Sequence, residues 1–184
     1  MITLEHRRLV RALADGDERK RWQAAKALSE VRDERTMRKV ERLVQSNADD
    51  EARAAAAYVL GFAGDPDVAP ALARILADRD ESVVVRAYVA EALGHLLQHE
   101  PVLAEVRLAI RGGLTDPAAE IRFWSIFAAG VLELHETRGM LERLADTDHG
   151  EVEGWWSVAE EAGWALRVLD GEEDPPLPNR SPRL

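Results

Sequence analysis

A nine-residue stretch that recurs along the chain decides the fold. It reads RWQAAKALS at residues 21–29, RAAAAYVLG at 53–61, RAYVAEALG at 86–94 and RFWSIFAAG at 122–130. Each copy begins with arginine and ends with serine or glycine, and successive arginines stand 32, 33 and 36 residues apart. A regular spacing of this length is the signature of a repeat architecture, in which each unit is one supersecondary element.

Small and apolar residues occupy fixed positions in every copy. The seventh residue after the arginine is leucine in the first three copies and alanine in the fourth, and Leu166 holds it in a degenerate fifth copy near residues 159–166. Apolar steps of three and four place these positions on one stripe of a helix. We therefore expect four leucines to be buried at equivalent places, namely Leu28, Leu60, Leu93 and Leu166.

A second amphipathic helix is expected after each of the first four copies, and aspartates stand where N-caps belong: Asp17, Asp49, Asp80 and Asp116. No stretch alternates with the period of a strand. The sequence predicts an all-α fold, a right-handed α-solenoid of about five stacked helical hairpins without a sheet. The expected units are a leading half-repeat at 3–14, repeats near 17–46, 49–78, 80–115 and 116–147, and a partial repeat at 151–169.

The repeated pattern of Asp, Arg, two small residues, Leu and Gly resembles the HEAT-like repeat family, in the short form first described in phycobilisome lyases. The resemblance covers roughly residues 3–170. It implies that the motif arginines join a ladder with aspartates of adjacent turns and that the second helices line a concave face. It also implies a scaffolding role, since these solenoids serve mostly as scaffolds.

Composition excludes several functions. The 184 residues carry 24 Lys and Arg against 34 Asp and Glu, a net charge of −10, and contain no cysteine. Disulfides and thiolate sites are therefore absent, and the acidity works against phosphate binding, so we expect no nucleic-acid partner. No apolar run has the roughly 20 residues that a membrane span requires. The start, MITLEHRR, lacks the apolar region of a signal peptide, so we expect none. We expect a cytoplasmic protein that binds a protein and no membrane.

Arginines recur once on each expected second helix, which makes them the first candidates for a binding surface: Arg42, Arg74, Arg111 and Arg143, with Arg11 on the leading helix. On a concave face they would form a basic stripe suited to carboxylates or phosphates. The alternative is that they pair with nearby acids of neighbouring repeats, which would make the stripe structural.

The C-terminal part combines aromatic residues with a proline-rich tail. Trp155, Trp156 and Trp164 are expected in the last helix, and residues 171–184 contain four prolines that favour an extended segment. One interpretation is a hydrophobic end cap, closed by Pro175–Pro178 lying across the rings. The other is an exposed docking or dimer surface at Trp155 and Trp156. The oligomeric state stays open.

Histidines raise the question of metal and catalysis. Deoxyhypusine hydroxylase is a HEAT-repeat enzyme that holds iron with His-Glu dipeptides, but His99-Glu100 and His135-Glu136 stand outside the register of that motif. His95, His99 and His135 are thus only weak metal candidates, expected to be solvated residues of turns. We expect no cofactor and no catalytic residue.

The functional prediction is a non-enzymatic scaffold or adaptor that binds a partner protein through its concave helical face. Two alternatives stay open. The first is an acidic inhibitor or immunity-type protein that neutralises a basic protein. The second, disfavoured because no motif is in register, is a lyase- or hydroxylase-like HEAT-repeat enzyme.

Overall fold

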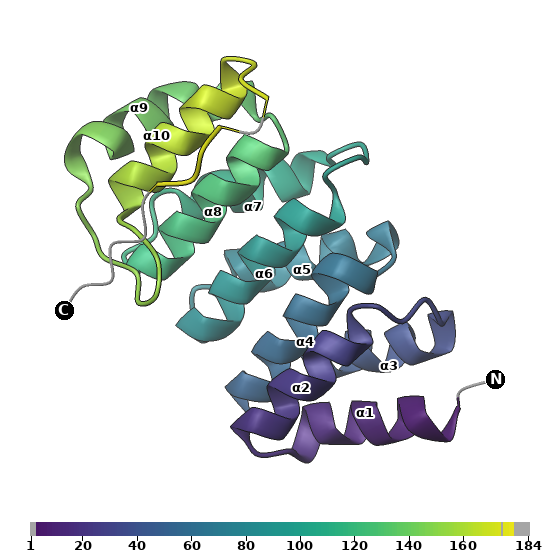
Figure 1. Ribbon diagram of the computed structural model, residues 1–184. Helices are drawn as coiled ribbons and strands as arrows, with labels where there is room; N and C mark the ends of the chain where they lie inside the picture. The colour runs from purple at the N-terminus through teal and green to yellow at the C-terminus, as the bar shows by residue number, and fades with distance from the viewer. Residues whose placement is uncertain (1–2, 174, 179–184) are drawn as a thin grey trace.

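The computed structural model describes residues 3–173 and 175–178, and it is built almost wholly of helices (Figure 1). The α-helices are α1 (Leu4–Asp15), α2 (Glu18–Leu28), α3 (Glu34–Val44), α4 (Asp50–Ala63), α5 (Ala69–Ala77), α6 (Val83–Leu96), α7 (Ala104–Gly113), α8 (Ala119–Val131), α9 (Arg138–Thr147) and α10 (Val158–Leu169). Two short 3₁₀ helices, η1 (Pro66–Val68) and η2 (His135–Thr137), precede α5 and α9. Within the described residues there is no strand, only an isolated bridge between Glu151 and Ser157.

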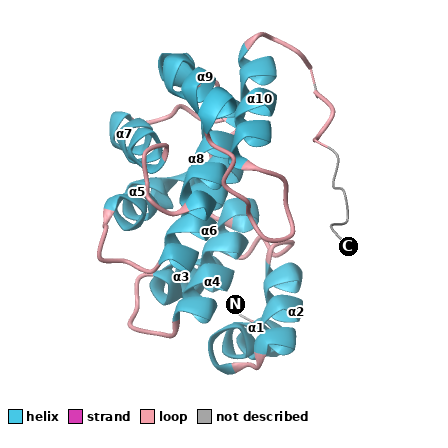
Figure 2. Cartoon of the chain, turned by 90° about the vertical axis from the view of Figure 1, so that its left-hand side faces the viewer, coloured by secondary structure: helices cyan, strands magenta, loops and turns pink. Residues whose placement is uncertain are grey.

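The helices form two layers. The motif copies lie on α2, α4, α6 and α8, and these helices with α10 stack side by side as the first layer (Figure 1). The second helices α3, α5, α7 and α9 cover one side of that layer, and the C-terminal segment runs along the other side (Figure 2). This arrangement confirms the predicted all-α solenoid.

The leucine stripe forms the core between the two layers. Leu28, Leu60 and Leu93 are at most 1% exposed, as the repeat register predicts. The expectation for Leu166 is wrong, because this side chain is only partly buried. In the described part of the chain α10 is the last helix and packs mainly on α8 and α9, so no later helix covers its outer side.

The motif glycines explain how closely the first helices approach one another. A Cβ atom added to Gly61 would lie 2.9 Å from the Cα of Ala92 on the next first helix, and one added to Gly130 would lie 3.0 Å from the Cβ of Ala165. A Cβ atom added to Gly94 would lie 2.8 Å from the ring of Phe127 and 3.2 Å from the Cα of Ala128. Because any side chain would push these backbones apart, glycine at the end of the motif sets the spacing of the layer.

Two of the four expected aspartate caps are confirmed. Asp17 and Asp49 are the N-caps of α2 and α4, where their carboxylates accept backbone N–H bonds. The expectation for Asp80 and Asp116 is wrong, because α6 follows Ser82 and α8 follows Ala118. Asp80 lies in the turn after α5, and Asp116 is held in the turn before α8.

The motif arginines tie successive repeats together. Each donates a hydrogen bond to a backbone carbonyl at or near the end of the preceding helix and forms an ion pair with an acid at the start of the next repeat. The four ion pairs are Arg21–Asp49 at 3.2 Å, Arg53–Glu81 at 2.9 Å, Arg86–Asp116 at 2.6 Å and Arg122–Asp148 at 3.0 Å. Each motif arginine thus binds an acid that stands before the arginine position of the next repeat. In the pair formed by Arg53, that acid is Glu81 and not the expected Asp80.

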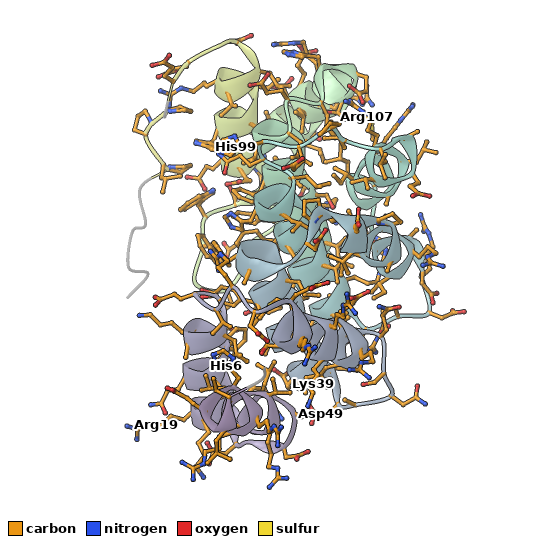
Figure 3. The ribbon with its side chains drawn as sticks, turned by 90° about the vertical axis from the view of Figure 1, so that its right-hand side faces the viewer. His6, Arg19, Lys39, Asp49, His99 and Arg107 are labelled. Atoms are coloured by element: carbon orange, nitrogen blue, oxygen red, sulfur yellow. The ribbon has the colours of Figure 1, made fainter. Side chains whose placement is uncertain are left out.

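Charged side chains surround the stack along its whole length, from Arg19 near one end to Arg107 towards the other (Figure 3). Arg107 pairs with Glu136 at 2.8 Å, and both side chains are more than 40% exposed. Among the described helices, none combines the length and apolar character that crossing a membrane requires.

Candidate functional site

Nine rings in mutual contact run along the first-helix layer from α2 to α10, and we call them the aromatic band. Every one is partly buried or exposed, and none is fully enclosed. The band consists of Trp22 on α2, Tyr58 and Phe62 on α4, Tyr88 and His95 on α6, Trp124 and Phe127 on α8, Trp155 in the loop before α10, and Trp164 on α10.

The ring contacts in the band are continuous. Trp22 lies 5.8 Å from Tyr58 and 5.3 Å from Tyr88, measured between ring centroids. Phe62 lies 5.0 Å from Tyr58 and 4.4 Å from His95. These distances are typical of attractive aromatic pairs, so rings from neighbouring repeats stabilise one another.

At the C-terminal half the band widens around Phe127. This ring lies 4.9 Å from His95, 5.7 Å from Trp124 and 6.0 Å from Trp164, on which it stacks. Trp155 continues the band, 5.1 Å from Trp124.

Helix geometry places the band opposite the second helices. Its members on the first helices stand one, two, five or nine residues after the motif arginine or its equivalent. At 100° per residue, these positions lie on the side of the helix away from the leucine stripe. The band is therefore the face of the first-helix layer that the second helices leave uncovered (Figure 2).

A cavity of 170 Å³ opens at the C-terminal end of the band. Trp124, Phe127 and Trp164 from the band line it, together with Phe123 and Trp156. Three ionisable groups also face it among the described residues: Glu91, His95 and Glu161. The cavity is too small for a drug-sized ligand, which needs about 300–1,000 Å³, and its size suits one side-chain head group.

Among the described residues, neither of the two carboxyl groups of the cavity forms an ion pair with a lysine or arginine. Glu161 is 2% exposed and accepts a hydrogen bond from the indole Nε1 of Trp156 at 2.6 Å. Burial raises the pKa of Glu161 to about 7, against the opposite effect of that hydrogen bond. Burial likewise raises the pKa of Glu91 to about 7. Both groups thus titrate near neutral pH.

His95 lies close to Glu91, with 3.9 Å between its Nε2 and the carboxylate Oε1. Burial between aromatic rings lowers the pKa of His95, so the imidazole is neutral at pH 7 and gives Glu91 no positive charge. The expectation of a solvated turn histidine is wrong for His95, which lies within α6 and is partly buried.

The other two histidines lie apart from this site. His99 follows α6 in an exposed turn, and His135 is exposed in η2. Across residues 3–173 and 175–178, no group of three or more His, Asp and Glu side chains is arranged to hold a metal ion.

The arginines of the second helices are all exposed. Arg42, Arg74, Arg111 and Arg143 lie on α3, α5, α7 and α9, and Arg11 lies on α1. In the described part of the chain none of them has a carboxylate within ion-pair distance; Arg42 and Arg74 donate instead to backbone carbonyls of their own helices. These residues therefore point to solvent from the layer opposite the aromatic band.

The tryptophans near the C-terminus differ from the expectation. Trp155 and Trp156 do not belong to the last helix but to the loop before it, because Ser157 caps α10 with Glu160 in a capping box and the helix starts at Val158. Trp156 is 5% exposed and belongs to the core, whereas Trp155 is 39% exposed. Of the two, only Trp155 contributes to a surface.

The tail lies against the band where the structure describes it. The carbonyl of Pro175 accepts a hydrogen bond from the indole Nε1 of Trp164 at 3.2 Å. Leu177 lines the cavity while remaining 62% exposed. The end-cap interpretation thus describes residues 175–178 in part. Of the predicted tail at 171–184, residues 174 and 179–184 lie outside the described residues.

Sequence reasoning missed the carboxyl groups of the cavity. Tyr58, Phe127 and Trp164 share one repeat position, five residues after the arginine or its equivalent, and Glu91 holds that same position on α6. A single acid at a position that is aromatic in three of the other four copies, and Lys26 in the first, was the available signal. Glu161 gave no such signal, since its burial depends on the loop that carries Trp156.

Comparison with known families identifies the repeats. The family model of HEAT repeats matches residues 7–94. The helical pairs within residues 7–94 are HEAT repeats. A search of the curated proteins finds no match.

Solved structures are similar in fold to this chain over most of its length. A chain in the complex of CpcE and CpcF of phycocyanin lyase from Nostoc sp. PCC7120 is 17% identical, with 88% of this chain and 97% of that chain covered and a TM-score of 0.70. An engineered protein is 19% identical over 91% of this chain and 80% of that one, with a TM-score of 0.56. A designed armadillo repeat protein in complex with the peptide (KR)4 is 17% identical over 88% and 80%, with a TM-score of 0.53. At such identities the likeness concerns the fold.

Proposed function

We propose that this HEAT-repeat chain is a non-enzymatic scaffold that binds a segment of a partner protein along the aromatic band. The observation that carries the proposal is the continuity of the band over five first helices. Phe62 and Trp155 are 41% and 39% exposed within it. Aromatic residues dominate the energetics of protein interfaces, and contiguous exposed apolar surface usually marks a contact site.

The shape of the band favours an extended partner segment. Each first helix contributes one or two rings, so the band crosses the helices along the axis of the stack. Solenoids of this kind use such repeated surfaces to bind elongated ligands. A segment that follows the band would meet a similar aromatic contact at each repeat.

Charge favours a partner segment that is basic as well as apolar. The chain has a net charge of −10. Glu91 and Glu161 face the cavity at the end of the band, and the charges of Glu91 and Glu51 help burial to raise the pKa of Tyr88 to about 12. Such a potential attracts basic groups and speeds their association. The inhibitor or immunity-type alternative uses the same charge, and it differs in requiring a whole folded basic protein.

The similar structures support a protein partner in general terms. One is a complex of two lyase proteins and another is a complex with a peptide. For this chain the same kind of partner is our proposal, and it includes no catalytic step. The second-helix arginines remain the competing surface, since they are exposed and unpaired within the described residues.

The test compares the two surfaces in one binding assay. A partner captured from the native source is identified and purified, and its affinity is measured by calorimetry. Phe62→Ala should weaken binding by about tenfold or more, as truncation of an interface aromatic does. Leu108→Ala is the matched control, because Leu108 is an exposed apolar residue of α7 on the other layer.

The arginine surface is tested by Arg74→Glu in the same assay, where we expect unchanged affinity. Loss of binding in Arg74→Glu with full affinity in Phe62→Ala would move the interface to the second helices and contradict the proposal.

A further inference from the structure

We propose that the cavity at the end of the aromatic band binds a methylated ammonium group, carried on a lysine side chain of the partner segment. The inference rests on the proposed function, because it names the chemistry of one residue in that segment. It follows from the walls of the cavity, from its two carboxyl groups and from its size.

The walls suit a cation. Indole and phenyl rings from α8, from α10 and from the loop before α10 surround the cavity, including Trp124, Trp155 and Trp164. The faces of such rings carry negative potential, which attracts a cation most strongly when water is excluded. Tryptophan is the strongest of the aromatic residues in this role.

The carboxyl groups supply a matching charge. Glu91 receives no hydrogen bond from a described residue, and Glu161 receives one, from Trp156. Of the described residues, no lysine or arginine forms an ion pair with either of them, and the only base lining the cavity is the neutral His95. Carboxyl groups held at this depth without a cation are costly to ionise, so a bound cation would restore the favourable charged state.

The scarcity of acceptors favours methyl groups on that cation. A primary ammonium carries three N–H donors and a guanidinium carries five. Burying donors without acceptors costs free energy, and the cavity offers little besides the two carboxyl groups and aromatic carbon. Methyl groups replace the donors with apolar surface that packs on the rings, while the positive charge is kept.

Size and position point to a side chain as the carrier. A cavity of 170 Å³ accommodates a head group but no larger ligand. It lies at the end of the band, where a bound partner segment would pass over Trp164. Leu177 of the tail lines the cavity and is largely exposed, so a side chain that enters from the band would displace Leu177.

The first experiment measures binding of small probes to the full chain by tryptophan fluorescence, since four tryptophans line the cavity. The probes are N-acetyl-trimethyllysine amide, N-acetyl-lysine amide, choline, and 3,3-dimethylbutan-1-ol, in which carbon replaces the choline nitrogen. We expect trimethyllysine to bind about tenfold or more tighter than lysine, and choline to bind about tenfold tighter than its neutral analogue.

Variants assign the effect to the carboxyl groups. Glu91→Gln with Glu161→Gln keeps the shape of the cavity and should abolish the preference for choline over its neutral analogue. Glu120→Gln is the control, since Glu120 is exposed in the first turn of α8. Lowering the pH from 8 to 5 should weaken choline binding to the native chain, because the carboxyl groups become protonated and any protonation of His95 adds repulsion.

Three results would overturn the inference. Equal affinity for choline and its neutral analogue would show a merely apolar cavity, and no binding of any probe would show no site. Tighter binding of choline than of trimethyllysine would indicate a small-molecule amine instead of a protein side chain. The proposed function is tested separately: if Phe62→Ala weakens partner binding while the Glu91 and Glu161 substitutions do not, the scaffold role stands and this inference is wrong.

Discussion

Replacing Glu161 by glutamine should make the stability of the chain less dependent on pH. Glu161 is 2% exposed, and burial raises its pKa from 4.5 to about 7. Each pKa unit corresponds to about 1.4 kcal/mol, so the rise corresponds to about 3 kcal/mol of stability that is sensitive to pH. Glutamine has nearly the same shape, can still accept the hydrogen bond from Trp156, and carries no charge at any pH.

The direction of the effect follows from proton binding. Between pH 4.5 and about 7 the folded chain binds a proton at Glu161 that the unfolded chain has released. The free energy of unfolding therefore falls as the pH rises through this window and levels off above it. Glutamine removes this contribution, so the variant should gain about 3 kcal/mol relative to the native chain between pH 4.5 and pH 8.

The assay is urea unfolding of both chains at several pH values across this range, followed by tryptophan fluorescence. Glu91 titrates in the same window, but it is present in both chains and cancels in the difference. Glu120→Gln, at an exposed position, should differ from the native chain by the same amount at every pH. If the free energies of unfolding of Glu161→Gln and the native chain change with pH in parallel, burial does not keep the carboxyl group neutral. The raised pKa of Glu161 in the cavity would then be refuted.

Three further changes test the repeat architecture by chemical denaturation. Leu60→Ala should cost about 2–5 kcal/mol through lost burial and a cavity, and a cost below about 1 kcal/mol would contradict its place in the core. Gly61→Ala should destabilise by about 1–3 kcal/mol, because its side chain meets the next helix, whereas Gly163→Ala in α10, with open space around it, should stabilise by about 0.5–1 kcal/mol. Arg86→Ala should lower the free energy of unfolding by about 3–5 kcal/mol, because it leaves a buried carboxylate unpaired. Arg107→Ala, in an exposed pair, should lower it by about 0–1 kcal/mol. Equal losses would mean that the arginine ladder stabilises the fold no more than an exposed ion pair does.

The repeat architecture could be predicted from the sequence because each repeat packs against its neighbours in a similar way. Leu60 and Leu93 are both buried, and Gly61 and Gly94 both lie close to the next first helix. Identical surroundings select similar residues, so the spacing of the motif alone predicts the helices and their buried stripe. The arginine ladder follows for the same reason, since each rung joins one repeat to the next.

Helix starts and the C-terminal loop were harder to predict, because their surroundings occur only once. Asp116 resembles an N-cap in sequence, but Arg86 from the preceding repeat holds its carboxylate in the turn before α8. Trp155 and Trp156 would continue the last helix by composition. The capping box at Ser157 starts that helix later and leaves one tryptophan in the core and the other on the surface.

Each first helix has one side whose residues the repeat pattern predicts and one side whose residues it does not. One side carries the arginine, leucine and glycine that recur because the repeats must pack, and substitutions there are expected to act on stability. The other side holds different residues at one repeat position, Tyr58, Glu91, Phe127 and Trp164 in successive copies. Packing does not require this variation, since the second helices leave that side uncovered. A scaffold that binds one partner segment in one register needs a surface that differs from repeat to repeat. The uncovered side of the first helices has such a surface, and its rings remain in contact. We therefore expect this side to determine which partner segment is bound.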